Sequence, residues 1–238
     1  MVYALLELQA PGVTEESAPS ALNVSLVLDF STSMKGDRIE TVKVTAIEII
    51  RKLRPQDILS IVIFSDRAAV LLPAGPRSDV RKVETSIHML NTGGGTEIYQ
   101  GLKSDHYEVQ KCAMSSSVNH NILLTGGHTY SDEAQCLSMA KIAQEQGIGI
   151  SGLGVGSEWN DAFLDQLAGS TGGSTVYIAR DQDIKRFLKQ KFYRLDQIYA
   201  NSVSYRFNRE PEVELQYAFC LQPELVASSL IRKMTSGL

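Results

Sequence analysis

A short apolar run that ends in an acidic, hydroxyl-rich turn constrains the fold of this chain more than any other segment. Residues 24–33 read Val-Ser-Leu-Val-Leu-Asp-Phe-Ser-Thr-Ser, and the first half is apolar at nearly every position, as in a strand covered on both faces. Alternate residues on an extended chain share a face, so Asp29, Ser31 and Ser33 can converge where the strand turns into a helix. Hard oxygen ligands without thiolate or imidazole suit Mg²⁺ or Mn²⁺. The segment therefore predicts a cation held at the end of a buried strand and offered to a partner.

The rest of the chain alternates between strand and helix patterns joined by short connections. This alternation is typical of a doubly wound, Rossmann-like α/β fold, with a mostly parallel sheet and helices on both faces. In such sheets the ligand lies beyond the carboxyl ends of the strands, where Asp29 falls. We predict strands at 23–29, 58–64, 68–72, 121–125, 148–155 and 174–178, and helices at 37–53, 78–90, 98–110, 133–146, 161–167 and 181–198.

The two ends of the chain follow a different pattern. Residues 202–207 and 212–219 alternate like antiparallel strands with one wet face, and we expect them to join a strand at 2–9 in a small β element. The sequence thus predicts an N-terminal strand and linker over 1–20, an α/β domain over 21–199 and the start of a C-terminal β-rich element over 200–238.

Composition excludes several classes of protein. A net charge of −4 argues against a general nucleic-acid binder, and no stretch approaches the length of a membrane span. Cys112, Cys136 and Cys220 match neither a zinc spacing nor a disulfide framework. Residues 1–7 lack the basic start of a signal peptide, so we expect reduced thiols and a cytoplasmic location.

Two further loops are expected to meet the first at the switch point of the sheet. One reads Gly94-Gly95-Thr96-Glu97, where the glycines let the backbone come close and Thr96 supplies a hydroxyl. The other follows the strand at 121–125 and reads Thr125-Gly126-Gly127-His128. Any one of these loops is common, whereas the three together are a specific signal.

With these loops the sequence resembles the von Willebrand factor A family, over roughly residues 23–198. The resemblance implies a metal-ion-dependent adhesion site in which Ser31, Ser33 and Thr96 ligate Mg²⁺ or Mn²⁺ directly and Asp29 does so through water. It also implies a protein partner whose Asp or Glu carboxylate completes the coordination, without nucleic acid and without membrane insertion. The strand at 2–9, ahead of the domain, suggests a bacterial member.

The sequence departs from the family pattern at one metal-site position. The family has an aspartate in a Thr-Asp-Gly loop, whereas this chain has Gly126. One unit charge a few ångströms from a divalent ion is worth on the order of several kcal/mol at an effective dielectric of 20, so weaker metal binding is expected. Asp132, which follows in the same loop, is the candidate substitute ligand; Asp105 and Glu97 are the alternatives.

The sequence motifs give less support to an enzymatic function. Gly152, Gly154 and Gly156 do not have the spacing of the three glycines in a dinucleotide-binding fingerprint. No Gly-x-Ser-x-Gly motif surrounds Ser31 or Ser33, as a serine hydrolase would need. An aspartyl-phosphate phosphatase needs an acid two residues after its nucleophile, where this chain has Ser31. We therefore expect a non-enzymatic recognition module. A metal-free interaction scaffold and, more remotely, a phosphate-ester hydrolase remain open.

The sequence leaves two possible roles open for each of two loop residues near the expected site. His128 either touches a partner or a bound anion, or is a surface residue without a role. Trp159 is either an exposed anchor for a partner or a plug of its own loop.

Overall fold

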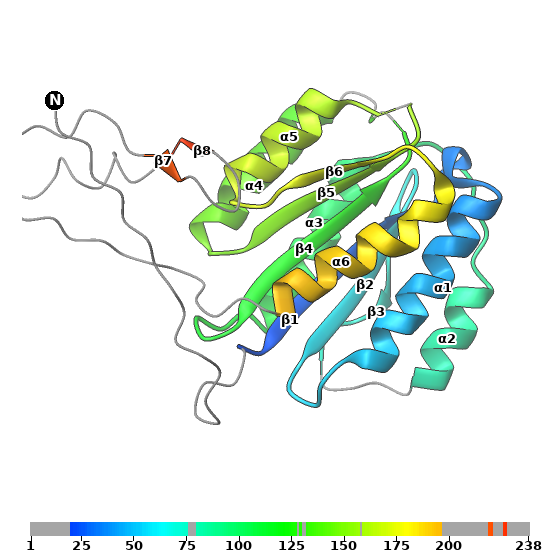
Figure 1. Cartoon of the computed structure of the whole chain (residues 1–238), viewed down its shortest axis with the longest axis horizontal. Helices are drawn as coiled ribbons and strands as arrows, with labels where there is room; N and C mark the ends of the chain where they lie inside the picture. The colour runs from blue at the N-terminus through cyan, green and yellow to red at the C-terminus, as the bar shows by residue number, and fades with distance from the viewer. Residues whose placement is uncertain are drawn as a thin grey trace, which may run out of the picture. The chain divides into compact units, whose positions relative to one another are not determined.

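The computed structural model describes residues 20–75, 80–127, 129, 132–157, 159–196, 219–220 and 226–227. Six strands form one sheet in the order β3-β2-β1-β4-β5-β6, with β1 at its centre (Figure 1). All neighbouring strands run parallel except β3, which is antiparallel to β2. The bounds are β1 Leu22–Asp29, β2 Ile58–Phe64, β3 Ala68–Leu72, β4 Val118–Thr125, β5 Gly149–Val155 and β6 Thr175–Ile178.

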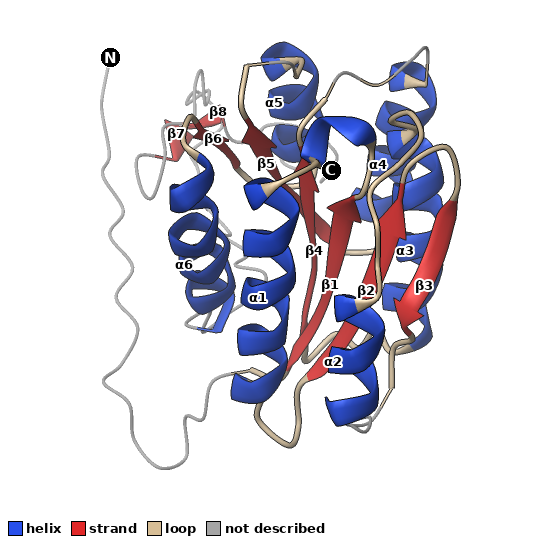
Figure 2. Ribbon diagram, turned by 90° about the vertical axis from the view of Figure 1, so that its right-hand side faces the viewer, coloured by secondary structure: helices blue, strands red, loops and turns tan. Residues whose placement is uncertain are grey.

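Helices cover both faces of the sheet (Figure 2). On one face lie α1 (Asp37–Lys52), α2 (Val80–His88) and α6 (Ile184–Asp196); on the other lie α3 (Ile98–Lys111), α4 (Glu133–Glu145) and α5 (Asp161–Ser170). Two short 3₁₀ turns, η1 (Thr32–Met34) and η2 (Asp181–Asp183), precede α1 and α6. This arrangement confirms the predicted doubly wound α/β fold.

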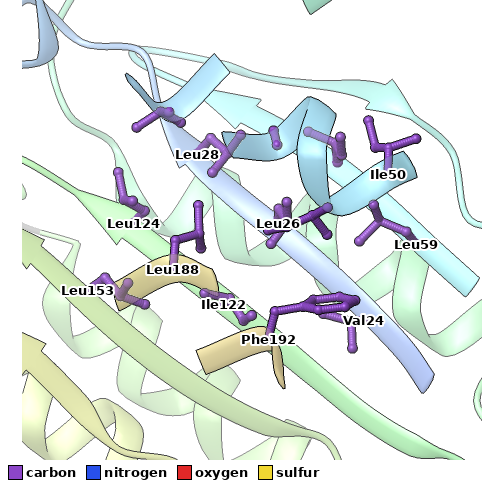
Figure 3. Packing of buried hydrophobic residues seen from close by; sticks show 14 of the residues in the cluster. Val24, Leu26, Leu28, Ile50, Leu59, Ile122, Leu124, Leu153, Leu188 and Phe192 are labelled. Atoms are coloured by element: carbon purple, nitrogen blue, oxygen red, sulfur yellow. The ribbon is translucent and has the colours of Figure 1, made fainter. Parts of the chain in front are cut away.

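The two faces of the sheet are packed differently. Below α1 and α6 the sheet is almost wholly apolar, and Val24, Leu26 and Leu28 of β1 point into this cluster (Figure 3). Below α3 a second apolar cluster includes Val27, Phe64 and Leu123. It ends toward the amino ends of the strands in a row of paired polar residues, Ser60, Ser25 and Asn121, which are all buried.

β4 begins three residues before the predicted strand. Its second and third residues, Asn119 and His120, are polar, but each has a hydrogen-bond partner on a neighbouring strand. Asn119 Oδ1 accepts a hydrogen bond from Asn23 Nδ2 at 2.9 Å, and His120 Nε2 lies 2.8 Å from Ser151 Oγ. Burying a polar group is inexpensive only when it is hydrogen-bonded, and these pairings were not visible in the sequence.

The chain divides into two units, Met1–Asn201 and Ser202–Leu238. Two-residue strands, β7 (Phe219–Cys220) and β8 (Val226–Ala227), pair antiparallel in the second. The predicted strands at 2–9 and 202–207, and nearly all of 212–219, lie outside the described residues, so the three-part division of the chain stays a prediction. Within the described part of the chain, no helix is long and apolar enough to cross a membrane.

Candidate functional site

The centre of the candidate site is the carboxyl end of β1. Asp29 is fully buried there, next to β4, where the direction of chain connection reverses. Its Oδ1 accepts a hydrogen bond from the Ser31 N–H at 2.7 Å. Burial raises the pKa of Asp29, and hydrogen bonds from Ser31, Gly126 and Thr125 counteract this rise. Asp29 therefore fixes the turn that carries the two serines.

The second loop is tied to the first through the backbone. The Gly93 N–H donates to the Phe30 carbonyl at 2.8 Å, and the Thr32 N–H donates to the Gly94 carbonyl at 3.2 Å. Gly94 has a φ of +81°, and a Cβ there would collide with the Asp66 carboxylate, so only glycine suits this position. The tie brings Thr96 to the turn after β1.

The third loop closes around the same carboxylate. Asp29 Oδ2 accepts from Thr125 Oγ1 at 2.9 Å and from the Gly126 N–H at 3.1 Å. Because both oxygens of Asp29 are engaged by backbone or hydroxyl donors, this residue joins the loops after β1 and β4. Asp29 and Gly126 thus lie together, as the sequence predicts.

The three predicted hydroxyls gather at one place. Ser31 Oγ lies 2.9 Å from Ser33 Oγ. A Cβ added to Gly127 would lie 3.1 Å from Thr96 Oγ1 and 3.2 Å from Ser33 Oγ, so both oxygens border the space that the glycine leaves free. Ser31 and Thr96 are buried, and Ser33 is half-buried. Three oxygen donors around a small space fit a hard divalent cation.

The Gly126 position is occupied by a neighbour. A Cβ on Gly126 would lie 2.5 Å from Met34 Sδ and 3.5 Å from Ser33 Oγ, and Met34 is fully buried. Gly126 lies outside the positive-φ range, so its backbone would accept another residue. The uncharged Met34 thioether thus packs where a side chain at 126 would begin.

Two of the candidate substitute ligands, Asp132 and Asp105, lie in surroundings of their own. Asp132 Oδ2 accepts from the Tyr99 N–H at 2.7 Å and its Oδ1 from Thr129 Oγ1, so its carboxylate holds the start of α3. Asp105 lies on the inner face of α3, beside Ser25 of β1. Ser25 is four residues before Asp29, which is about 13 Å along the strand. The role of Asp132 as a metal ligand stays a prediction.

Arg38 contributes to the site although no sequence pattern indicates it. Its Nη1 donates to the Ser33 carbonyl at 3.2 Å, and its Nε donates to Asp181 Oδ1 at 2.8 Å. Its guanidinium also fills the space beside Gly156, at the end of β5. Arg38 therefore connects the serine turn to η2, a contact over 143 residues that no local pattern encodes.

The structure bears on the role of Trp159 but not on that of His128. His128 lies outside the described residues. Trp159 donates its indole N–H to the Gly156 carbonyl at 3.1 Å and packs against Gly154 and Tyr177. These contacts favour a plug of its own loop over a free anchor.

With this geometry, the comparisons with known proteins agree on the family. Residues 23–190 match the von Willebrand factor type A domain. An uncharacterized protein, sll0103, of Synechocystis is 31% identical over 82% of this chain and 46% of its own length. Human inter-alpha-trypsin inhibitor heavy chain H4 is 30% identical over 72% of this chain and 20% of its own. This chain belongs to the von Willebrand factor type A domain family.

A solved structure agrees with the fold. Proximal thread matrix protein 1 from the mussel byssus, with zinc in its metal-ion-dependent adhesion site motif, superposes with a TM-score of 0.64 at 18% identity. The match covers 75% of this chain and 46% of that one. The chain spans less than half the length of the curated relatives named above. The two curated relatives come from a bacterium and from human. A bacterial origin of this chain therefore stays a prediction.

Proposed function

We propose that this domain is a non-enzymatic protein-interaction module whose rim binds Mg²⁺ or Mn²⁺ and, through the ion, an acidic partner. Ser31, Ser33 and Thr96 would hold the ion directly and Asp29 through water, at a site that lacks the family aspartate. Membership of the von Willebrand factor A family and the inter-alpha-trypsin inhibitor relatives support an interaction module.

One observation carries the proposal. The Thr96 and Ser33 hydroxyls border the same small space beside Gly127, and Ser31 Oγ lies within 2.9 Å of Ser33 Oγ. These hydroxyls come from the loops after β1 and before α3. Hydrogen bonds of Asp29 and Gly94 hold both loops, and the loop after β4 that carries Gly127, together. A bound ion would supply a positive charge at the rim, and the chain's own residues would position it for a partner's carboxylate.

Titration calorimetry with Mn²⁺ tests the proposal. We expect one site, and we expect Thr96→Val, which removes only the hydroxyl, to weaken it at least about tenfold, since a lost bond to a charged group is worth roughly 1.5–3 kcal/mol. Thr85→Val is the matched control, because this exposed hydroxyl bonds to the Arg81 carbonyl within α2. Absence of Mn²⁺ binding at millimolar concentration, or equal loss in both variants, would overturn the proposal.

A metal-free interaction scaffold is the second candidate. The observation in its favour is that the site's own carboxylate, Asp29, already accepts three hydrogen bonds from the protein. This alternative predicts that a chelator leaves partner binding unchanged, whereas the metal-dependent function predicts that it abolishes binding.

A further inference from the structure

Several buried oxygens beneath α3 lack a hydrogen-bond partner. Asp105 of α3 and Ser60 and Asn121 of the sheet are each exposed by 1% or less. Among the described residues, neither carboxylate oxygen of Asp105 has a hydrogen-bond partner, and the same holds for Ser60 Oγ and Asn121 Oδ1. Buried polar groups of folded proteins are nearly always hydrogen-bonded, so four unpaired oxygens in one region require an explanation.

The register of the sheet brings these groups together. Ser60 of β2, Ser25 of β1 and Asn121 of β4 are partners across adjacent strands, so their side chains share one face at about 5 Å from strand to strand. Asp105 lies beside this row, since Ser25 and Asn121 both act on its carboxyl group. The Ser25 hydroxyl donates to the Ser60 carbonyl at 3.4 Å, so its hydrogen is directed away from Asp105. These four residues form an internal oxygen cluster that joins α3 to three strands.

The cluster has one ionisable acid and no cation beside it. Glu108, one turn along α3, acts on Asp105 through its charge, but it is paired with Lys111 Nζ at 2.6 Å. Burial lowers the pKa of His106 and raises the pKa of Cys136 on α4, so both side chains are neutral at and above pH 7. The three strands supply only serine and asparagine. Within the described part of the chain, the groups that act on the Asp105 carboxyl therefore include no cation.

Unpaired oxygens around a single buried negative charge suit a small monovalent cation. Water can donate hydrogen bonds to these oxygens, but it brings no charge to balance the carboxylate. A divalent ion would leave a buried positive charge uncompensated, which is costly. We propose that the internal oxygen cluster binds Na⁺, with the Asp105 carboxylate as the counter-charge and the Ser60 and Asn121 oxygens as neutral ligands. This site is separate from the rim and does not depend on the proposed function.

Na⁺ and a proton compete for the same carboxylate. Burial raises the pKa of Asp105 to about 7, so the proton occupies the carboxyl group at pH 5 and leaves it by pH 8. A ligand that binds only the folded chain stabilises that chain. Na⁺ should therefore recover part of the stability that ionisation of Asp105 costs at pH 8, and it should have no such effect at pH 5.

Urea denaturation in NaCl and in choline chloride at equal ionic strength tests the proposal, because choline is too large for a buried site. At pH 8 we expect NaCl to raise the ratio of folded to unfolded protein at least about tenfold, the gain when Na⁺ exceeds its dissociation constant tenfold. At pH 5 we expect the two salts to be equivalent. In carboxyl carbon NMR, Asp105 should titrate at a lower pH in NaCl than in choline chloride.

A pair of matched variants assigns the effect to the cluster. Asp105→Asn keeps the size of the side chain and removes its charge, so we expect the difference between the two salts at pH 8 to vanish. Asp165→Asn removes an exposed carboxylate from α5 and should keep the difference.

Three results would overturn the proposal. The first is equal stability of the parent in both salts at pH 8, which is the result expected if only water or a proton occupies the cluster. The second is a preference for NaCl that persists in Asp105→Asn, which would place the ion elsewhere. The third is an equal preference at pH 5 and pH 8, which would be a general effect of the salt.

Discussion

Two buried aspartates, Asp29 at the end of β1 and Asp105 on the inner face of α3, show how differently one domain accommodates the same side chain. Both have no exposed surface. Asp29 receives three hydrogen bonds, from Ser31, Thr125 and Gly126. Asp105 has no donor within hydrogen-bonding geometry of either oxygen among the described residues.

The pKa values follow from this difference. Burial raises the pKa of Asp105 to about 7, and the nearby Glu108 charge adds to the rise, while Ser25 and Asn121 lower it in part. A buried carboxylate without donors is more stable as a neutral acid. Burial raises the pKa of Asp29 as well, but three donors around its carboxylate counteract that rise, whereas neither oxygen of Asp105 has a donor at hydrogen-bonding distance among the described residues. The rim is thus the place where the fold supplies donors to a buried carboxylate.

The largest expected effect comes from removing the rim carboxylate. Asp29→Ala leaves three buried donors without an acceptor, at roughly 1–3 kcal/mol each. We expect the free energy of unfolding to fall by on the order of 5 kcal/mol in urea denaturation. Asp29→Asn keeps one acceptor oxygen and should lose less. A loss below about 1 kcal/mol for the Ala variant would show that the rim does not depend on this carboxylate.

The interior carboxylate should behave in the opposite way. The pKa of Asp105 rises on folding from 3.8 to about 7, so its neutral form favours the folded state at low pH, and this stability is lost as the pH rises toward 7. The full difference is about 4 kcal/mol at pH 8. We expect Asp105→Asn, which stays neutral, to be more stable than the parent at pH 8 and to have a flatter profile from pH 4 to 8 in urea denaturation.

The exposed Asp165 on α5 provides the matched control for Asp105. Asp165→Asn should leave the pH profile of the parent unchanged. A parent protein whose stability does not fall between pH 4 and 8 would contradict the assignment of a protonated Asp105.

A smaller pH effect is expected from a buried base, His120, on the face of the sheet opposite to α3. His120 is buried beside Ser151, and burial, helped by the positive charge of Lys191, lowers its pKa to about 3. The unfolded chain takes up this proton near pH 6.5 and the folded chain does not, so stability falls as the pH drops below 6.5. At pH 5 the loss is about 2 kcal/mol. We expect His120→Gln to lack this part of the acid sensitivity in thermal unfolding followed from pH 7 to 5, and an unchanged acid profile would contradict it.

Much of the fold was predictable because it follows from local patterns. Apolar runs, helical stripes and short connections identified the six strands of the sheet and their alternation with helices. The loops with Asp29, Thr96 and Gly126 could also be identified, because each follows a predictable element. The start of β4 at Val118 could not, since Asn119 and His120 are compatible with a strand only through partners on β1 and β5.

The sequence by itself determined which oxygen-bearing residues end the central strands and that residue 126 carries no charge, because both follow from chain order and residue type. Only the tertiary structure decided that the Met34 sulfur fills the space beside Gly126, that Arg38 connects the serine turn to η2, and that Asp105 lies among buried polar side chains instead of at the rim. These contacts join residues far apart in the chain or on different layers, and packing in three dimensions sets them, whereas periodicity along the sequence does not.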